Sequence, residues 1–147
     1  MKNREEGLME IYERIKANRV ALGIKTFKWI PTSPIQEEDM PCIFLLEGSD
    51  SIMKHSSRST TGFPAQRVME ATVELVAADP TDIKTLFRKV RQAVFAVRGT
   101  DPVEYNSRIS DKVFFNENRI EGPEGYGLPK VKGIRLVLDL VYTDECF

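Results

Sequence analysis

The chain of 147 residues has one histidine and two cysteines, and this shortage limits the chemistry that it can carry. Cys42 and Cys146 lie far apart and form no metal-binding or redox motif, so we interpret them as free thiols in a reducing compartment. A metal site would have to depend on carboxylates, and these show no ligand spacing. The sequence therefore predicts no metal and no other cofactor.

The single histidine, His55, does not suggest an active site either. It stands next to Ser56 and Ser57, but a serine nucleophile needs a base that is held in place by a third group. The polar segment around these residues offers nothing that would fix such a geometry. We therefore interpret His55 as a solvated residue and expect the chain not to be an enzyme.

Long apolar runs and an excess of one charge are missing as well. No stretch approaches the roughly 20 apolar residues of a membrane-spanning helix, and the charged N-terminal segment lacks the apolar core of a signal peptide. With 21 basic and 22 acidic residues, the formal net charge is -1. This balance excludes a global basic field that would collect nucleic acid or bind a membrane surface.

Two segments have the periodicity of amphipathic helices. Apolar residues recur at helical spacing between residues 8 and 15 and again between residues 83 and 97. In the second helix, Asp79 is expected at the N-cap position and Pro80 at the first helical position. Asp82 then places negative charge at this end of the helix, where the helix dipole favours it.

Strand-like patterns occur in five segments, residues 24–30, 42–47, 65–78, 112–115 and 131–143. In the last segment, alternate residues from Ile134 to Tyr142 form one apolar face, but Val137 and Val141 lie on the other face. These two valines predict that part of the second face is covered, for instance by another subunit. The order of elements predicts a single α+β domain over residues 1–147, with one mostly antiparallel mixed sheet and both helices packed on one face.

The most polar long segment runs from Gly48 to Pro64 and is too long for a tight turn. We expect it to be either a mobile loop or an extended hairpin arm. In the second helix, four basic residues fall in a narrow sector beside the apolar stripe: Lys84, Arg88, Arg91 and Arg98. This stripe is interpreted as a solvated face, as a contact for acidic groups of a neighbouring subunit, or as a surface that faces DNA.

A loop rich in glycine and proline, EGPEGYGLP, runs from Glu121 to Pro129. Its glycines give the pattern G-x-x-G-x-G, and a strand follows, whereas a dinucleotide or phosphate loop needs a helix N-terminus behind it. A small nucleotide-binding module using Gly122 to Gly127 therefore stays only as an alternative. The loop is better explained as a fixed turn between two strands, with Tyr126 exposed at its tip as an interface residue.

Two stretches together carry a resemblance to a known family. They are IEGPEGYGLPKVKGIRLVLDLVYTD, from Ile120 to Asp144, and VMEATVELVAADPTDIKTLFRKVRQAVF, from Val68 to Phe95. With the N-terminal helix and the chain length, they resemble the tail terminator or tail completion proteins of long-tailed bacteriophages and of contractile, phage-derived particles. The resemblance covers most of the chain as an order of elements and is specific only in the last strand and the loop before it.

The resemblance implies a structural protein of the virion tail or neck, assembled in the cytoplasm of a host bacterium. Such proteins form a hexameric ring on the last ring of tail tube protein, stop the growth of the tube and present a surface to the head–tail connector protein. The ring channel would allow DNA to pass without sequence-specific binding, and no membrane is involved. Another neck or head–tail connector component of the same particle is the alternative within this class.

The resemblance also gives roles to segments that carry no chemistry. The segment from Gly48 to Pro64 would be an arm that reaches a neighbouring subunit or the tail tube, and the loop from Glu121 to Pro129 would lie at a ring contact. The expected subunit or partner interface consists of ten residues: Met53, Lys54, His55, Arg58, Arg88, Arg91, Tyr126, Leu128, Val137 and Val141.

Overall fold

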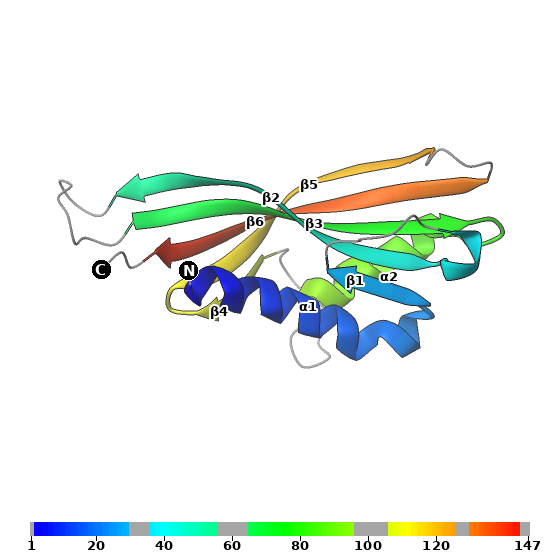
Figure 1. Ribbon diagram of the computed structural model, residues 1–147, viewed down its shortest axis with the longest axis horizontal. Coiled ribbons are helices and arrows are strands. Elements are labelled where there is room, and N and C mark those ends of the chain that lie inside the picture. The colour runs from blue at the N-terminus through cyan, green and yellow to red at the C-terminus, as the bar shows by residue number, and fades with distance from the viewer. Residues whose placement is uncertain (1, 30–35, 56–64, 96–105, 126–129, 145–147) are drawn as a thin grey trace.

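The computed structural model describes residues 2–29, 36–55, 65–95, 106–125 and 130–144 (Figure 1). The elements follow one another in the order α1 (Lys2–Leu22), β1 (Thr26–Trp29), η1 (Glu37–Asp39), β2 (Cys42–His55), β3 (Ala65–Ala78), α2 (Ile83–Phe95), β4 (Asn106–Ser110), β5 (Val113–Gly125) and β6 (Val131–Asp144). The six strands form one sheet in the order β1-β2-β3-β6-β5-β4. β1 and β2 are parallel, and the other neighbouring pairs are antiparallel. The predicted α+β fold class is confirmed.

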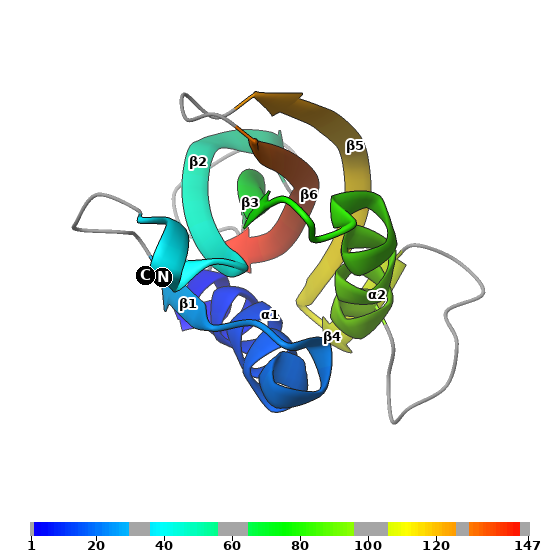
Figure 2. The same ribbon diagram turned by 90° about the vertical axis from the view of Figure 1, so that its right-hand side faces the viewer.

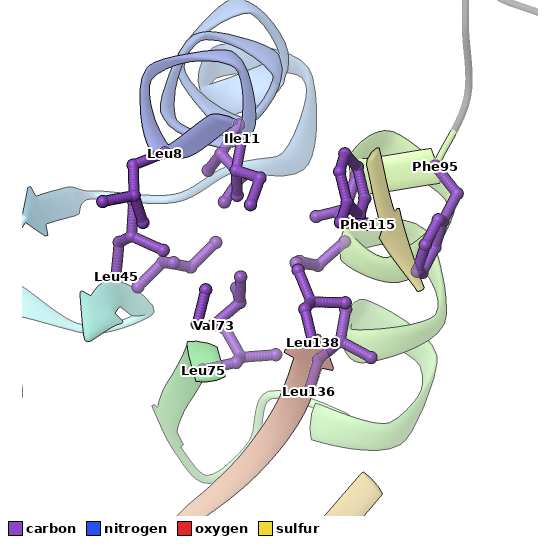
Figure 3. Packing of buried hydrophobic residues seen from close by; sticks show 14 of the residues in the cluster. Leu8, Ile11, Leu45, Val73, Leu75, Phe95, Phe115, Leu136 and Leu138 are labelled. Carbon is purple, nitrogen blue, oxygen red and sulfur yellow. The ribbon is translucent and has the colours of Figure 1, made fainter. Parts of the chain in front are cut away.

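Both helices lie on one face of the curled sheet, as Figure 2 shows from one end of the molecule. α1 contacts β5 and β6, and α2 contacts β3 and β6. Leu8, Ile11 and Ile15 of α1 are fully buried in this interface, as their helical spacing predicted. In Figure 3, Leu8 and Ile11 face the sheet residues Val73 and Leu138 across the core. The alternation of apolar and polar residues in β3 and β6 thus places the apolar face of the sheet under the helices.

A small residue and a cation hold α1 in place. A Cβ atom added to Gly7 would lie 2.5 Å from a methyl carbon of Leu140, so this glycine lets α1 lie close to β6. The guanidinium group of Arg14 donates a hydrogen bond of 2.8 Å to the carbonyl oxygen of Val94 and lies 5.3 Å from the centre of the Phe115 ring. α1 is therefore tied both to the sheet and to α2. No helix in the described ranges is long and apolar enough to cross a membrane.

The start of α2 differs from the sequence prediction. The helix begins at Ile83, after Asp79 and Pro80, and Asp82 is its N-cap. The Asp82 carboxylate accepts hydrogen bonds of 3.3 Å from the backbone N–H of Thr85 and of 2.7 Å from its hydroxyl. This pairing satisfies one of the free N–H groups at the helix N-terminus, which the carboxylate of Asp79 does not do.

Two strands are longer than predicted, and one strand was not predicted. β2 continues to His55 and pairs with β3 back to Ala65, which supports the hairpin arm over the loop for residues 48–55; residues 56–64 lie outside the described ranges. We call β2 residues Gly48–His55 together with β3 residues Ala65–Met69 the arm. β5 continues to Gly125, so the first half of the predicted glycine loop is strand. β4 falls in a stretch with no apolar alternation, and its pairing with β5 forms it.

Candidate interaction surfaces

The predicted interface residues lie in three separate places. Met53, Lys54 and His55 are at the end of β2, in the arm. Arg88 and Arg91 are on α2, and Val137 and Val141 are on β6. The remaining three predicted residues lie outside the part of the chain that the structure describes: Arg58, Tyr126 and Leu128.

A carboxylate at the base of the arm joins α1 and three strands. Asp50 of β2 accepts a hydrogen bond of 2.6 Å from the hydroxyl of Tyr142 in β6. It also accepts hydrogen bonds of 3.0 Å from Arg67 in β3 and of 3.1 Å from Arg4 in α1. Arg4 also forms an ion pair with Glu47 of β2, with an N–O distance of 2.8 Å. We call Arg4, Asp50, Arg67 and Tyr142 the Asp50 cluster.

The charges in this cluster are set by its hydrogen bonds. Burial alone would raise the pKa of Asp50, but the hydrogen bonds from Tyr142 and Arg67 outweigh it and lower this pKa below its ordinary value. Burial and the hydrogen bond to Asp50 raise the pKa of Tyr142 to about 12. Asp50 is therefore ionised and Tyr142 is neutral at pH 7, and the arm is fixed to the body of the protein by charge-assisted hydrogen bonds.

Sequence reasoning missed this cluster because its members are far apart in the chain. Asp50 and Tyr142 are separated by 92 positions. One feature of the sequence could have indicated it. Arg67 and Tyr142 occupy positions that belong to the apolar faces of their strands, near the strand ends. Charged or polar residues in such positions need partners, because buried polar groups are almost always hydrogen-bonded.

The four residues of the predicted basic stripe on α2 do not share one environment in the structure. Arg91 forms a two-pronged ion pair with Glu117 of β5, with N–O distances of 2.7 and 2.6 Å. Lys84 and Arg88 are exposed, and Arg98 lies outside the described residues. Arg91 thus has a structural role within the chain, since its charge is neutralised there. Lys84 and Arg88 are the two described residues of the stripe that face solvent.

The face of the sheet that points away from the helices also contains buried apolar residues, and their burial is seen in the single chain. Val137 and Val141 are only 1% and 2% exposed in the single chain. A second apolar cluster on this face contains Met40, Cys42, Phe44, Val76 and Val131. The burial of the two valines therefore needs no neighbouring subunit, contrary to the reason for which they were selected. Burial raises the pKa of the Cys42 thiol to about 12, which keeps it protonated and unreactive.

Polar residues cover the rest of this face as a row of ion pairs. Arg135 of β6 is paired with Glu74 of β3, whose side chain is buried. Arg119 of β5 is paired with Glu70 of β3 at 3.1 Å and with Glu121 at 3.7 Å. These pairs link β3, β6 and β5 across the sheet and explain the alternating charges along the three strands.

The described part of the glycine loop is a strand irregularity and not a phosphate cradle. Gly122 has a φ of 96°, which favours glycine. A Cβ atom on it would lie 2.8 Å from the carbonyl oxygen of Gly133. The register of β5 and β6 shifts between Glu121 and Glu124, as in a β-bulge. Gly122 thus serves the close approach of two strands, and the nucleotide-binding alternative loses its main support.

In the described ranges, no group of three or more His, Cys, Asp or Glu residues lies close enough to hold a metal ion. A shallow pocket of about 150 Å³ between β4 and β5 is lined by Ser107, Arg108, Phe114 and Asn116. This lining offers no carboxylate or imidazole that would act as a general base.

Comparison with known proteins reveals a likeness in fold. No protein-family model and no curated protein matches the chain. A chain in the solved structure described as "Virion of native gene transfer agent (GTA) particle" is similar, with a TM-score of 0.50 and 13% sequence identity. The match covers 91% of this chain and 92% of that chain. The protein therefore shares its fold, over nearly its whole length, with a chain of a gene transfer agent virion.

Proposed function

We propose that this chain is a structural virion protein that forms a ring, most simply a hexamer, at the head-proximal end of a tail tube. The ring ends polymerisation of the tube and gives the head–tail connector protein a surface to bind. The carrying observation is the likeness to a chain of the gene transfer agent virion, which extends over 91% of this chain and 92% of the other. The resemblance of residues 68–95 and 120–144 to tail terminator proteins points to the same role.

The arm is suited to docking on another protein. It projects at one end of the sheet, beside both termini in Figure 1, and its base is fixed by the Asp50 cluster. An arm held in this way loses little conformational entropy when it binds, which favours affinity. We assign the arm, with Met53, Lys54 and His55 near its tip, to the contact with the tail tube protein or with a neighbouring subunit.

The exposed positive charges on α2 suit an acidic neighbour or the DNA that passes through the ring. Lys84 and Arg88 carry this role, whereas Arg91 is committed to Glu117. We expect Arg88→Glu to weaken ring assembly or DNA retention without changing the fold. Lys89→Glu, an exposed residue outside the stripe on the same helix, is the matched control. If Arg88→Glu behaves like Lys89→Glu in ring formation and infectivity, the stripe has no part in assembly.

The proposal is tested by adding the purified chain to purified tail tubes of the particle that encodes it. A terminator caps one end of each tube as a ring and stops further elongation when more tube protein is added. Electron microscopy of negatively stained tubes shows the caps, and tube length against time shows termination. A chain that forms rings but binds only the head connector would instead be another neck component. A chain that neither forms rings nor binds either partner would overturn the proposal.

A further inference from the structure

One arginine of the sheet lacks the carboxylate partner that the other sheet arginines have. In the described strands, the three others form ion pairs with carboxylates of the same chain: Arg67, Arg119 and Arg135. Arg108 of β4 is exposed, and none of the carboxylates that the structure describes forms an ion pair with it. Asp139 shares this face of the sheet, but it lies two strands away and accepts a hydrogen bond from Asn118. The guanidinium group of Arg108 is therefore available to a group from outside the chain.

Arg108 lines the shallow pocket between β4 and β5, together with Phe114, Asn116 and Ser107. In the register of the two strands, Arg108 lies directly opposite Phe114, and Asn116 follows two residues later on β5. The side chains of Arg108, Phe114 and Asn116 therefore share one face of the sheet, because alternate residues of a strand point to the same side. This is the face that points away from the helices, since Phe114 lies opposite Val141 of β6.

The size and chemistry of this pocket suit one acidic side chain beside an apolar group. Its volume of about 150 Å³ is well below the roughly 300 Å³ of the smallest pockets that hold small molecules. The guanidinium group of Arg108 and the amide group of Asn116 both supply N–H donors, which favour a carboxylate. The half-buried ring of Phe114 offers an apolar surface next to these donors. Such a pocket suits an anchor residue of a partner protein better than a free ligand.

The outer side of α1 carries a matching pair of groups. Met9 is 47% exposed, and Glu13, four residues later on the same side of the helix, is exposed as well. None of the described cations forms an ion pair with Glu13. Residues four apart on a helix have Cβ atoms about 5–6 Å apart, and directly opposite residues of an antiparallel strand pair have them about 4.5–5.5 Å apart. The thioether and carboxylate of α1 thus have nearly the same spacing as the ring of Phe114 and the guanidinium group of Arg108.

We propose that the outer side of α1 in one copy docks at the pocket between β4 and β5 of a second copy. Met9 packs against the ring of Phe114, and a thioether next to an aromatic ring is a favourable contact. The carboxylate of Glu13 accepts hydrogen bonds from Arg108 and Asn116, and a charge-assisted pair with an arginine fixes both position and orientation. The inference rests on the proposed function, because it supplies a subunit contact of the proposed ring.

A single chain cannot form this contact with itself. Both helices cover one face of the sheet (Figure 2), and the outer side of α1 points away from that face, whereas the pocket lies on the opposite face. Each copy therefore offers α1 to one neighbour and the pocket to another, and such a head-to-tail contact repeats until a ring closes. A second copy is the favoured occupant because this chain carries both members of the pair, an unpaired arginine beside an aromatic ring and an unpaired carboxylate beside a methionine.

Charge reversal on either side of the contact tests it. We expect Arg108→Glu and Glu13→Arg each to weaken self-association at least about tenfold, because each sets two like charges against each other. Lys89→Glu and Glu38→Arg are matched controls that reverse exposed charges on α2 and η1, outside both patches, and they should assemble like the wild type. Light scattering over a concentration series measures the mass, and circular dichroism checks that all variants are folded. Assembly of both single variants as in the wild type would overturn the contact.

The two reversals should cancel when they are combined. Arg108→Glu and Glu13→Arg in one chain restore opposite charges at every contact, so the double variant should self-associate within about threefold of the wild type. An equimolar mixture of the two single variants should assemble as well, with the two variants alternating. If the double variant and the mixture stay as dissociated as the single variants, the contact between Glu13 and Arg108 is overturned, and the ring on tail tubes would still stand.

Cross-linking covers the case in which the chain assembles only on tail tubes. In a Cys146→Ser background, Glu13→Cys and Arg108→Cys together should give disulfide-linked multimers on the tubes, and each alone should give far fewer. Rings on the tubes without such cross-links would overturn the contact between α1 and the pocket but keep the proposed function. Chains that form no ring on the tubes would overturn the proposed function itself.

Discussion

At the arm end of the sheet a carboxylate holds α1 and three strands together, whereas at the opposite end a glycine lets two strands approach. Asp50 connects Arg4, Arg67 and Tyr142 through three hydrogen bonds. Gly122 adopts a φ of 96° and lies against the backbone of Gly133. One end thus depends on side-chain chemistry and the other on backbone geometry. The two ends should respond differently to substitution and to pH.

Asp50→Ala should have the largest effect on stability. It leaves Arg4, Arg67 and the Tyr142 hydroxyl without their shared acceptor in a partly buried site, and we expect the free energy of unfolding to fall by about 3 kcal/mol. Urea unfolding followed by circular dichroism measures this change. Asp139→Ala is the control, because the 3.0 Å hydrogen bond that Asp139 accepts from Asn118 is exposed. Equal losses in the two variants would contradict a special role for Asp50.

Gly122→Ala should come next, with a loss of about 2 kcal/mol. The positive φ is strained for alanine, and the added Cβ atom meets the Gly133 carbonyl at 2.8 Å, where only backbone movement can relieve the contact. Gly125→Ala is the matched control, since a Cβ atom there meets nothing within 4 Å. We expect the melting temperature of Gly125→Ala to match that of the wild type. A harmless Gly122→Ala would mean that the bulge adjusts freely.

Tyr142→Phe should cost about 1 to 2 kcal/mol at neutral pH, because Asp50 loses one hydrogen bond. The pH dependence gives a sharper test. The pKa of Tyr142 is raised to about 12 in the folded protein, so its contribution is complete below the unfolded pKa of about 10 and is lost as the pH rises from 10 through about 12. The stability difference between wild type and Tyr142→Phe should therefore shrink across this window.

The pH dependence that comes from Asp50 has the opposite sign to that of Tyr142, because folding lowers the pKa of Asp50. Its contribution to the free energy of unfolding is therefore present above the unfolded pKa of about 3.9. This contribution is lost as the pH falls through the folded pKa. Asp50→Asn should flatten this loss of stability at low pH, whereas Gly122→Ala should keep the pH dependence of the wild type. If Asp50→Asn loses stability at low pH as the wild type does, other carboxylates control acid unfolding.

Glu70→Gln should have the smallest effect, about 0.5 kcal/mol or less. Its ion pair with Arg119 is exposed, with side-chain exposures of 37% and 45%, and such pairs contribute little. Urea midpoints in low and high salt measure it. A loss as large as that of Asp50→Ala would mean that the ion pairs on the second face stabilise the sheet as strongly as the Asp50 cluster.

The parts of the fold that the sequence predicted are those with a buried face. Burial of one face produces the alternation of apolar residues in β3 and β6 and the apolar stripes of α1 and α2. The structure confirms all four elements. β4 and the outer halves of β2 and β5 have few buried apolar residues among those that the structure describes, so their sequences show no alternation of apolar and polar residues. They are strands because a neighbouring strand offers hydrogen bonds, which is a tertiary effect.

The interaction surfaces stay predictions, but the structure changes two of the reasons behind them. Val137 and Val141 indicated a cover for the second face, but both are already buried in the single chain. Arg91 was assigned to a partner, but Glu117 lies opposite it only after β5 has paired with β6. Sequence shows the type and spacing of residues. It does not show which distant residue satisfies a charge.

The most direct test of the account is to image purified tail tubes after adding the chain. We expect a ring with a central hole at one end of each tube, and tubes that no longer grow when tube protein is supplied. A chain that stays monomeric at every concentration and leaves the tubes uncapped and growing would contradict it.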